Sequence, residues 1–206
     1  MSIILVANPK GGSGKSTLAT NIAGYFSSQG QRVMLGDTDR QQSALGWLKR
    51  RPASCTPIGT WDIDAKNIAR PPQGVSHVVL DSAAGLHGWR LQELLDMADR
   101  IVVPIQPSMF DILASQQFLH ALAEHIPASV RQRKIAIVGM RVDRRTRAAD
   151  QLEQFVAGLG LPVLAFLRDT QNYIQLAAHG LTLFDVAPSR VQRDREQWQD
   201  MIHWLT

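Results

Sequence analysis

The stretch "ANPKGGSGKSTLATNIA", residues 7–23, decides the fold of this chain. Its glycines let the backbone turn so tightly that several N–H groups point at one anion. The apolar run before it, residues 2–8, is typical of a buried strand, and the residues after it carry apolar side chains at helical spacing. A strand, a glycine-rich turn and a helix in this order predict a loop that holds the phosphates of a nucleotide.

Two lysines lie in this loop, although one is enough to reach the phosphates. Lys15 follows the last glycine, where its ammonium can contact the β- and γ-phosphates, and the hydroxyl of Ser16 can bind Mg²⁺. Lys10 comes earlier, next to Pro9, which replaces the first glycine of the general pattern. The extra lysine raises the question of a second molecule. The predicted nucleotide-binding residues are Gly11, Gly12, Ser13, Gly14, Lys15, Ser16 and Thr17.

Three aspartates stand at the ends of apolar runs. Asp37 and Asp39 close the run that begins at residue 32, and in an extended segment they would share one face. Asp81 ends the run "VSHVVLD", residues 75–81, where a carboxylate can hold Mg²⁺ directly or through water. Carboxylates beside a phosphate site suit metal binding and the positioning of water, so we expect all three near the nucleotide.

The rest of the chain alternates apolar runs with amphipathic segments. This order predicts an α/β fold, a doubly wound and mainly parallel sheet with helices on both faces, in one domain spanning residues 1–206. The irregular stretch 50–74 predicts a loop with a short strand around Trp61. Further strands are expected at 32–39, 77–83, 100–106, 134–142 and 162–167, and helices at 15–30, 89–98, 110–126, 147–160 and 193–206.

Composition excludes several classes of protein. The chain has 206 residues, 45% of them hydrophobic, which is ordinary for a globular domain. Its single cysteine, Cys55, cannot form an internal disulfide, and its six histidines lack metal-ligand spacing. No run approaches the roughly 18 apolar residues of a membrane span, and the N-terminus lacks the pattern of a signal peptide. We therefore expect a cytoplasmic protein.

The motifs "KGGSGKST", "DTDRQQS", "VVLDSAAG" and "VVPIQPSMFD" resemble those of the ParA/MinD family of P-loop ATPases with a deviant Walker A loop. The resemblance covers nearly the whole chain, including its tail, and is greatest to short ParA-type members. It implies an ATP hydrolase that needs Mg²⁺, forms a homodimer around ATP and binds DNA without sequence preference. It also implies a ParB-like or other small adaptor that stimulates hydrolysis, and a cargo such as a plasmid, a chromosome, a chemoreceptor cluster or a carboxysome. When bound to ATP, such a protein associates with the nucleoid.

The resemblance also assigns roles to individual residues. Lys10 matches the lysine that crosses the dimer interface to the partner's nucleotide, and Asp39 matches the acid that orients the attacking water. Lys15 matches the lysine that contacts the phosphates of its own subunit. The catalytic residues implied are thus Lys10, Lys15 and Asp39, and the metal-binding residues implied are Ser16, Asp37 and Asp81.

Two positions depart from the common form of the family. "SAAG" follows Asp81 where many members have a proline, which changes the stiffness of the loop more than its chemistry. Met140 stands where many members carry an asparagine beside the adenine, so the family's contact to the base is not expected at this position.

Arginines gather in the last third of the chain, where residues 131–206 hold half of the 22 lysines and arginines. They are candidates for DNA contact, and without interleaved aromatic residues any such binding should be independent of sequence. Alternatively they form a solvated basic face that Asp143 and Asp194 interrupt. The candidates are Arg144, Arg145, Arg147, Arg168, Arg190 and Arg193, with Arg195 nearby.

Two other functions stay open. A MinD-like ATPase positioned on membranes would need a basic amphipathic helix at the C-terminus, and "REQWQDMIHWLT" carries little positive charge. A metabolic P-loop ligase of the dethiobiotin-synthetase type would need further catalytic groups, which the motifs do not provide. Ser108 is expected to cap a helix, and the resemblance places Asp111 near the dimer interface.

Overall fold

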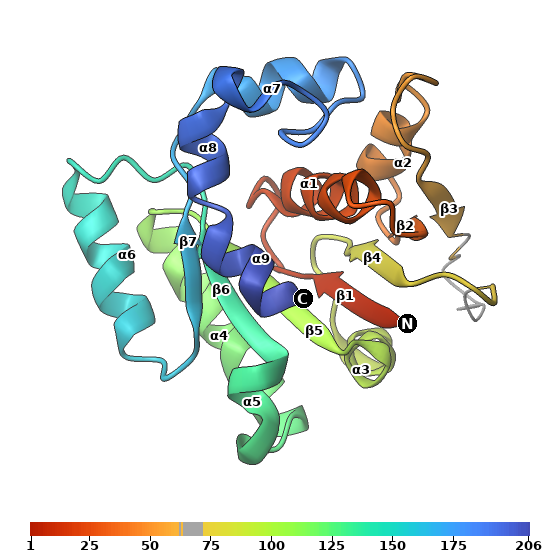
Figure 1. The fold of residues 1–206 in the computed structure, drawn as a ribbon. Coiled ribbons are helices and arrows are strands. Elements are labelled where there is room, and N and C mark those ends of the chain that lie inside the picture. The colour runs from red at the N-terminus through yellow and green to blue at the C-terminus, as the bar shows by residue number, and fades with distance from the viewer. Residues whose placement is uncertain (62, 64–71) are drawn as a thin grey trace.

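The computed structural model describes residues 1–61, 63 and 72–206. These residues form a seven-stranded sheet in the order β3-β2-β4-β1-β5-β6-β7, and every neighbouring pair is parallel (Figure 1). The predicted fold class is therefore confirmed. The strands are β1 (Ser2–Val6), β2 (Val33–Asp37), β3 (Gly59–Trp61), β4 (His77–Asp81), β5 (Arg100–Ile105), β6 (Ile135–Gly139) and β7 (Val163–Phe166).

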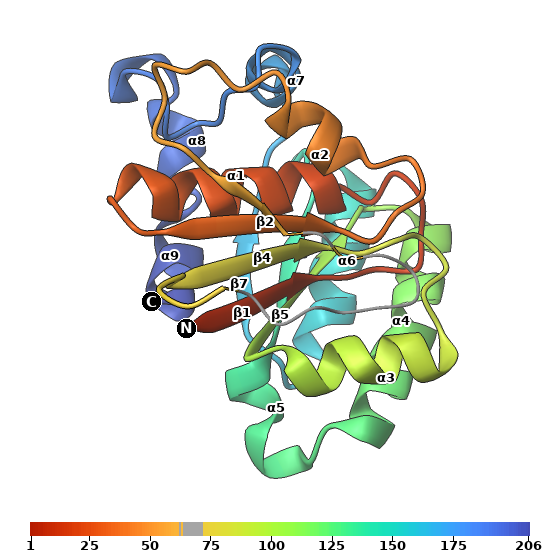
Figure 2. The same ribbon diagram turned by 90° about the vertical axis from the view of Figure 1, so that its right-hand side faces the viewer.

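Helices cover both faces of the sheet (Figure 2). One face packs against α1, α2, α7 and α9, and the other against α3, α4 and α6. None of the helices in the described part of the chain combines the length and hydropathy needed to cross a membrane. The helices are α1 (Lys15–Ser28), α2 (Ser43–Leu48), α3 (Gly88–Met97), α4 (Met109–His125), α5 (Ala128–Lys134), α6 (Arg147–Ala157), α7 (Gln171–Ala178), α8 (Gln192–Glu196) and α9 (Gln199–Leu205), with a 3-10 turn at Pro188–Arg190.

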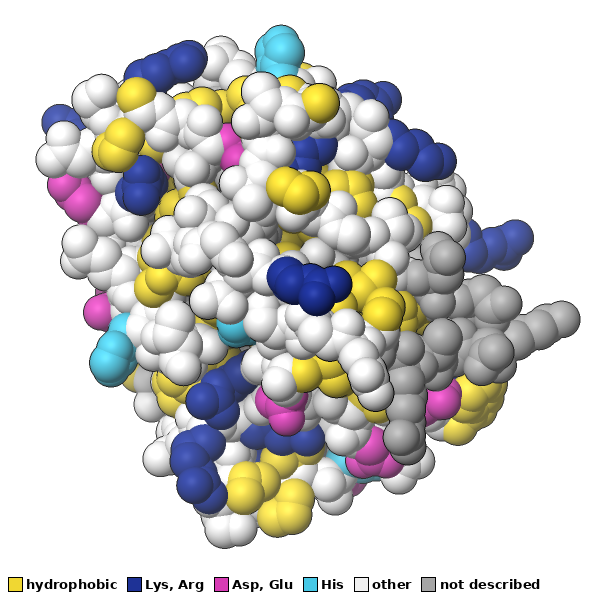
Figure 3. Space-filling model, turned by 45° about the vertical axis from the view of Figure 1, so that its right-hand side comes forward, with side chains coloured by type: hydrophobic (Ala, Val, Ile, Leu, Met, Phe, Trp, Pro, Cys, Tyr) yellow, Lys and Arg dark blue, Asp and Glu magenta, His cyan; other side chains and the backbone are white. Residues whose placement is uncertain are grey.

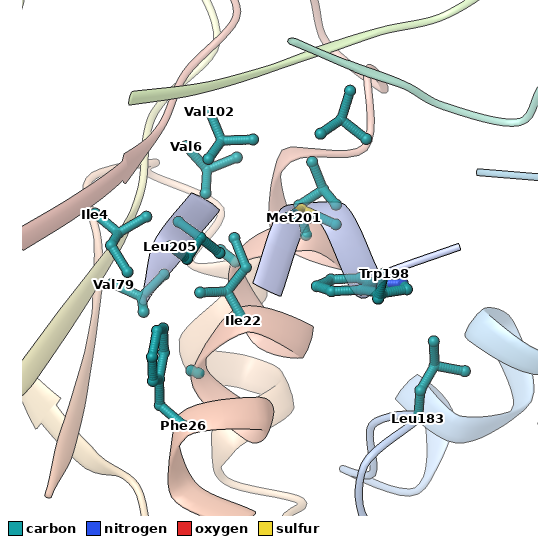
Figure 4. Close-up of a cluster of buried hydrophobic side chains, with 14 of the residues drawn as sticks. Ile4, Val6, Ile22, Phe26, Val79, Val102, Leu183, Trp198, Met201 and Leu205 are labelled. Atoms are coloured by element: carbon teal, nitrogen blue, oxygen red, sulfur yellow. The ribbon is translucent and has the colours of Figure 1, made fainter. Parts of the chain in front are cut away.

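The central strand β1 contributes to two separate cores. Ile4 and Val6 face the core under α1, whereas Ile3 and Leu5 face the core under α3 and α4. Strands that are buried on both faces need continuous apolar runs, which is why these strands are evident in the sequence. Figure 4 shows the first core, where Ile22 of α1 lies among side chains from β1 and from α9.

The C-terminal segment differs from its prediction as one helix over 193–206. It forms α8 and α9 with a break at Trp198, whose side chain is fully buried. The Trp198 indole N–H donates a 2.9 Å hydrogen bond to the hydroxyl of Tyr173 on α7. The break between α8 and α9 accompanies the burial of Trp198 and its contact with Tyr173. The spacing of apolar residues in the sequence does not reveal this contact between distant segments.

Because all the strands are parallel, they end at the same edge of the sheet, and β1, β2 and β4 point to the right in Figure 2. The chain leaves β1 toward the face that holds α1, and it leaves β4 and β5 toward the face that holds α3 and α4. Connections that diverge from neighbouring parallel strands leave a crevice at their carboxyl ends, which is where open α/β sheets bind ligands. The glycine-rich loop follows β1, Asp37 and Asp81 are the last residues of β2 and β4, and Asp39 lies just beyond β2, so all of them gather at this edge.

Candidate nucleotide-binding site

The glycine-rich loop connects β1 to α1 and depends on left-handed backbone at two glycines. Gly12 has φ 78° and Gly14 has φ 100°, a region that disfavours any residue with a Cβ. Gly14 is the N-cap of α1, and no side chain of the described residues caps that helix. The first amides of a 14-residue helix are thus left for an anion, and the helix dipole adds to the attraction.

Lys15 is held inside the loop. Its ammonium donates a 2.7 Å hydrogen bond to the backbone carbonyl of Lys10, and the residue is only 7% exposed. Burial lowers the pKa of Lys15, and the charges of Asp81 and Asp39 oppose that shift. The side chain of Lys10 instead places its ammonium 5.9 Å from the centre of the Phe110 ring. The two lysines therefore lie in different surroundings, one inside the loop and one against an exposed aromatic residue.

Asp81 and Ser16 make the most distinctive contact of the site. The Ser16 hydroxyl donates a 2.5 Å hydrogen bond to Asp81 Oδ2, whereas Asp81 Oδ1 is buried and has no partner in the described part of the chain. Burial raises the pKa of Asp81 to about 7 against the effect of the Ser16 hydrogen bond, and the charges of Asp37 and Asp39 raise it further. An orphaned carboxylate oxygen beside a hydroxyl at a phosphate loop matches the oxygen ligands that Mg²⁺ prefers.

Asp37 lies level with Asp81 on the neighbouring strand, but its carboxylate is already occupied. It accepts hydrogen bonds from the backbone N–H groups of Asp39 (2.9 Å), Ala44 (2.8 Å) and Leu45 (3.4 Å). Burial raises the pKa of Asp37, and these amides oppose the shift. Asp37 therefore fixes the first turn of α2, a contribution that its spacing in the sequence does not reveal.

Asp39 lies beyond the end of β2, so the predicted extended segment shared with Asp37 is wrong. The chain bends after β2, and the Asp39 carboxylate accepts hydrogen bonds from the N–H groups of Gln41 (2.9 Å) and Ala84 (3.3 Å). The electrostatic influence of Asp39 reaches both Lys15 and Asp81. All three predicted acids are thus present around the loop, although a bend rather than a strand places Asp39.

The segment "SAAG" after Asp81, the first departure from the family pattern, donates two backbone hydrogen bonds to the loop after β2. Ala83 donates its N–H to the Thr38 hydroxyl (3.0 Å), and Ala84 donates its N–H to Asp39. Proline has no N–H, so a proline at either position would lose one of these bonds. Sequence reasoning missed Thr38, which also donates its own N–H to the carbonyl of Asp81 (3.0 Å) and so links the ends of β2 and β4.

Met140, the second departure, packs directly on the phosphate loop. It is 4% exposed, and its Cε lies 2.7 Å from the position that a Cβ on Gly14 would take. The loop is also braced by Gln106 at the end of β5, whose side-chain amide donates to the carbonyl of Gly12. Gln106 is a second residue that sequence reasoning missed, and its place directly after a strand was the available signal.

The predicted DNA-contact arginines do not form one group. Arg144 and Arg145, between β6 and α6, and Arg147, the first residue of α6, are exposed, and Arg190 and Arg193 are exposed near α8. Arg145 pairs with Asp143 at 2.8 Å, and its hydrogen bonds lower the pKa of Asp143 to about 2. On the face drawn in Figure 3 the basic side chains are mostly scattered, apart from a group near the foot of the view, over α5. That helix ends with Arg131, Arg133 and Lys134, which the sequence analysis did not select.

Arg168 needs a different interpretation from the other arginines. Its Nε donates a 2.5 Å hydrogen bond to Asp194, whose side chain is fully buried, and the Asn172 amide donates to the other carboxylate oxygen. A buried carboxylate without such partners would be strongly destabilising. Arg168 therefore stabilises the packing of α7 and α8 at the end of β7, and it is not a free cation.

Comparison with known proteins assigns the family. The model of the CobQ/CobB/MinD/ParA nucleotide binding domain matches residues 4–183, and the chain belongs to this family. It is 28% identical over 185 residues to maintenance of carboxysome distribution protein A of Gloeobacter kilaueensis, covering 88% of this chain and 83% of that protein. It is 30% identical over 184 residues to the chromosome-partitioning ATPase Soj of Thermus thermophilus, covering 73% of each. The predicted resemblance is thus confirmed.

Solved structures support the same fold. A putative plasmid partition protein of Borrelia burgdorferi bound to AMPPNP superposes with a TM-score of 0.76 at 14% identity, covering 98% of each chain. The ATP complex of a Cyanothece McdA variant superposes with a TM-score of 0.75 at 13% identity, covering 98% of this chain and 96% of the other. Both of these neighbours were solved with a nucleotide.

Proposed function

We propose that this protein is an ATPase that positions a cargo, and that ATP binding makes it dimerise. The observation that carries the proposal is the separation of the two lysines. Lys15 is buried and tied to the loop, whereas the ammonium of Lys10 lies outside it against the ring of Phe110. A loop that needed only its own lysine would have no use for the second one. The relatives named for carboxysome distribution and chromosome partitioning support the positioning role.

Different residues of the site bind the phosphates, hold Mg²⁺ and orient the attacking water. The amides of residues 11–17 and the Lys15 ammonium hold the phosphates, and Ser16 with Asp81 holds Mg²⁺. When bound, Mg²⁺ neutralises charge on the phosphate oxygens. Asp39 orients the attacking water, and Asp37 keeps the segment from Asp39 to α2 in place through its three amide contacts. This assignment keeps Asp37 near the metal but gives it a positioning role.

Lys10 supplies its charge to the nucleotide of a second subunit. Phosphoryl transfer depends on stabilising negative charge that develops on the phosphate oxygens. A lysine delivered by another subunit adds that stabilisation only in the dimer, as an arginine finger does in other P-loop proteins. Hydrolysis is then controlled by assembly, and an adaptor that alters the dimer can stimulate it.

The ATP-bound dimer binds DNA through exposed arginines, without sequence preference. Arg144, Arg147, Arg190 and Arg193 are exposed, and no carboxylate of the described residues forms an ion pair with them. Each phosphate contact of this kind makes affinity fall as salt rises. We further propose a single domain over residues 1–206, a cytoplasmic location on the nucleoid, and an adaptor of the ParB-like kind.

The alternative of a membrane-bound C-terminal helix lacks support. An amphipathic helix needs a free apolar face to enter a bilayer. Met201 and Leu205 of α9 are instead buried in the core beside α1 (Figure 4). The other two apolar residues of this seven-residue helix, Ile202 and Trp204, are partly buried and pack against the same core.

The test is the mass of the purified protein with ATP and Mg²⁺, measured by light scattering. We expect the wild type to be monomeric without nucleotide, and the Asp39→Ala variant, which is blocked in hydrolysis, to be a stable dimer with ATP. A variant that stays monomeric with ATP would contradict the proposal. The dimer should also retain plasmid DNA in a filter assay at low salt and release it at high salt.

A further inference from the structure

Large hydrophobic side chains are exposed on two helices, α3 and α4, that begin near the phosphate loop. Four of the six exposed large hydrophobic residues in the described part of the chain lie in the first two turns of α3 and α4. We call them the apolar rim: Trp89 (64% exposed), Met109 (53%), Phe110 (75%) and Leu113 (48%). A monomer gains nothing from holding such side chains in water, and large apolar side chains exposed near a binding loop indicate a candidate interaction surface.

The segments that carry the apolar rim both contact the chain at Pro9 and Lys10. On one side the Lys10 ammonium is 5.9 Å from the centre of the Phe110 ring. On the other side the Gly85 N–H donates a 2.9 Å hydrogen bond to the carbonyl of Pro9, and that loop leads directly into the first turn of α3 with Trp89. The entry to the phosphate loop is thus flanked by the first turns of α3 and α4.

The position of Phe110 is fixed by its own helix. Ser108 is the N-cap of α4, its hydroxyl accepts the N–H of Asp111, and the two side chains are hydrogen bonded to each other. This double contact closes the first turn around Phe110, as an N-terminal capping interaction does. The backbone that carries Phe110 is therefore fixed, although the ring itself is largely exposed to water.

Lys10 needs an anion that this subunit does not provide. No carboxylate in the described part of the chain lies within 4.0 Å of it. Its own phosphate loop already holds Lys15, whose ammonium is bonded to the Lys10 carbonyl. An unpaired cation beside an exposed aromatic ring is complementary to a surface that presents a negative charge within an apolar border.

We infer that Phe110 is a positioning residue, which holds Lys10 toward a second copy of this chain, and that the apolar rim is the surface which that copy covers. The inference rests on the proposed function, because the anion that meets Lys10 is the nucleotide phosphate of the second copy. A two-fold arrangement brings the same surface of each subunit together. Both rims are then buried in one interface, each beside the Lys10 of its own subunit. Excluding water there strengthens the attraction between ammonium and phosphate.

The experiment measures dimer dissociation with ATP and Mg²⁺ by sedimentation velocity, in the Asp39→Ala background. We expect Phe110→Ala to weaken the dimer by roughly 100-fold, because apolar area and the ring are both lost. Phe110→Leu keeps apolar area without the ring and should weaken it by about tenfold, since both sites of the dimer lose a cation–π contact. Phe110→Tyr should restore the wild-type value. Ile174→Ala is the control, since Ile174 is 55% exposed on α7 and outside the rim.

Two further measurements separate positioning from burial alone. In a Lys10→Ala background, Phe110→Leu should have less than about twofold further effect, because the ring has no ammonium to hold. Binding of a fluorescent ATP analogue by dilute monomer should be unchanged in every Phe110 variant. If Phe110→Leu weakens the dimer equally with and without Lys10, the positioning role is wrong.

The outcomes distinguish this inference from the proposed function. An Asp39→Ala parent that stays monomeric with ATP overturns both. A parent that dimerises normally while Phe110→Ala dimerises equally well overturns the inference alone. Rim variants that dimerise normally but no longer respond to an adaptor would assign the surface to that adaptor, and this result also overturns it.

Discussion

The hydroxyl of Ser16 donates to one carboxylate oxygen of Asp81, and the other oxygen of Asp81 is buried without a partner among the described residues. A buried acid in this condition is costly when it is ionised, and burial raises its pKa to about 7. The protein therefore keeps, next to its phosphate loop, a carboxylate that lowers the stability of the nucleotide-free state.

Replacing Asp81 by Asn should stabilise the protein in the absence of nucleotide and Mg²⁺. The folded-state pKa of Asp81 is raised, so the folded protein holds a proton that the unfolded chain releases, and stability falls as pH rises from about 4 to 7. Asp81→Asn should gain at most about 4 kcal/mol at pH 8, and the gain should shrink toward pH 4. Urea unfolding at pH 6 and pH 8 measures this difference. Equal pH slopes for the two proteins would contradict the burial argument.

Substituting the two lysines should separate nucleotide binding from dimerisation. Lys15→Ala should lose ATP binding, because it removes the buried ammonium of the phosphate loop. Lys10→Ala should keep most ATP binding and lose the ATP dimer and the hydrolysis that an adaptor stimulates. Equilibrium dialysis and light scattering measure the two effects, with the exposed Lys49→Ala as a control. Equal loss of ATP binding in both variants would leave the role of Lys10 across the interface without support.

Breaking the ion pair between Arg51 and Asp185 should destabilise the fold strongly. The two side chains are only 4% and 5% exposed and are joined by hydrogen bonds of 2.7 and 2.9 Å. Burial acts to raise the pKa of Asp185, but hydrogen bonds from Arg51 and Thr182 bring it below its usual value. Arg51→Met leaves this carboxylate buried and unpaired, which should cost about 3–5 kcal/mol.

The control for that substitution is Arg145→Met, which removes an exposed partner of Asp143. Urea unfolding should show no measurable change for it, because exposed ion pairs contribute little. The contribution of the Arg51 pair should be complete at neutral pH and should be lost as pH falls through the lowered pKa of Asp185. Similar losses for the two arginine variants would contradict the importance of burial.

Two glycines with similar backbone angles should respond differently to alanine. Gly160 has φ 64°, and no atom of the described residues lies within 4 Å of a new Cβ, whereas Gly180 has φ 69° and would place its Cβ 2.4 Å from the backbone of Arg50 and Arg51. Gly160→Ala should cost about 1 kcal/mol from the left-handed backbone alone. Gly180→Ala should cost at least about 2 kcal/mol more, because a rigid backbone cannot move aside. Thermal unfolding compares them, and equal costs would show that the contact with Arg50 yields easily.

The sequence predicted the parallel sheet and the phosphate loop because both depend on local signals. Strands buried on both faces need unbroken apolar runs, and left-handed backbone needs glycine, as at Gly12 and Gly14. Strand β3 was also expected around Trp61. Helices α2, α5 and α7 were missed because each has at most eight residues, which is too short to show a helical period.

Features that depend on distant partners could not be predicted. Nothing near Arg168 indicates that a fully buried carboxylate 26 residues away will accept its hydrogen bond. Likewise, the spacing of Asp37 indicates an acid at a strand end but not that its oxygens will hold the first turn of α2. These roles exist only once the sheet has brought the segments together, so residue type and spacing do not contain them.

The strand order also determines when the protein can fold as it is made. β1 has no partner in the first third of the chain, because it pairs with β4 and β5, and β2 lies on the far side of β4. The phosphate loop is synthesised early. The strand before it, β1, can pair with both of its neighbours only after residue 105 has been synthesised. Such pairing between distant segments is slow. We therefore expect ATP to stabilise an emerging chain fully only after both neighbours of β1 have been made.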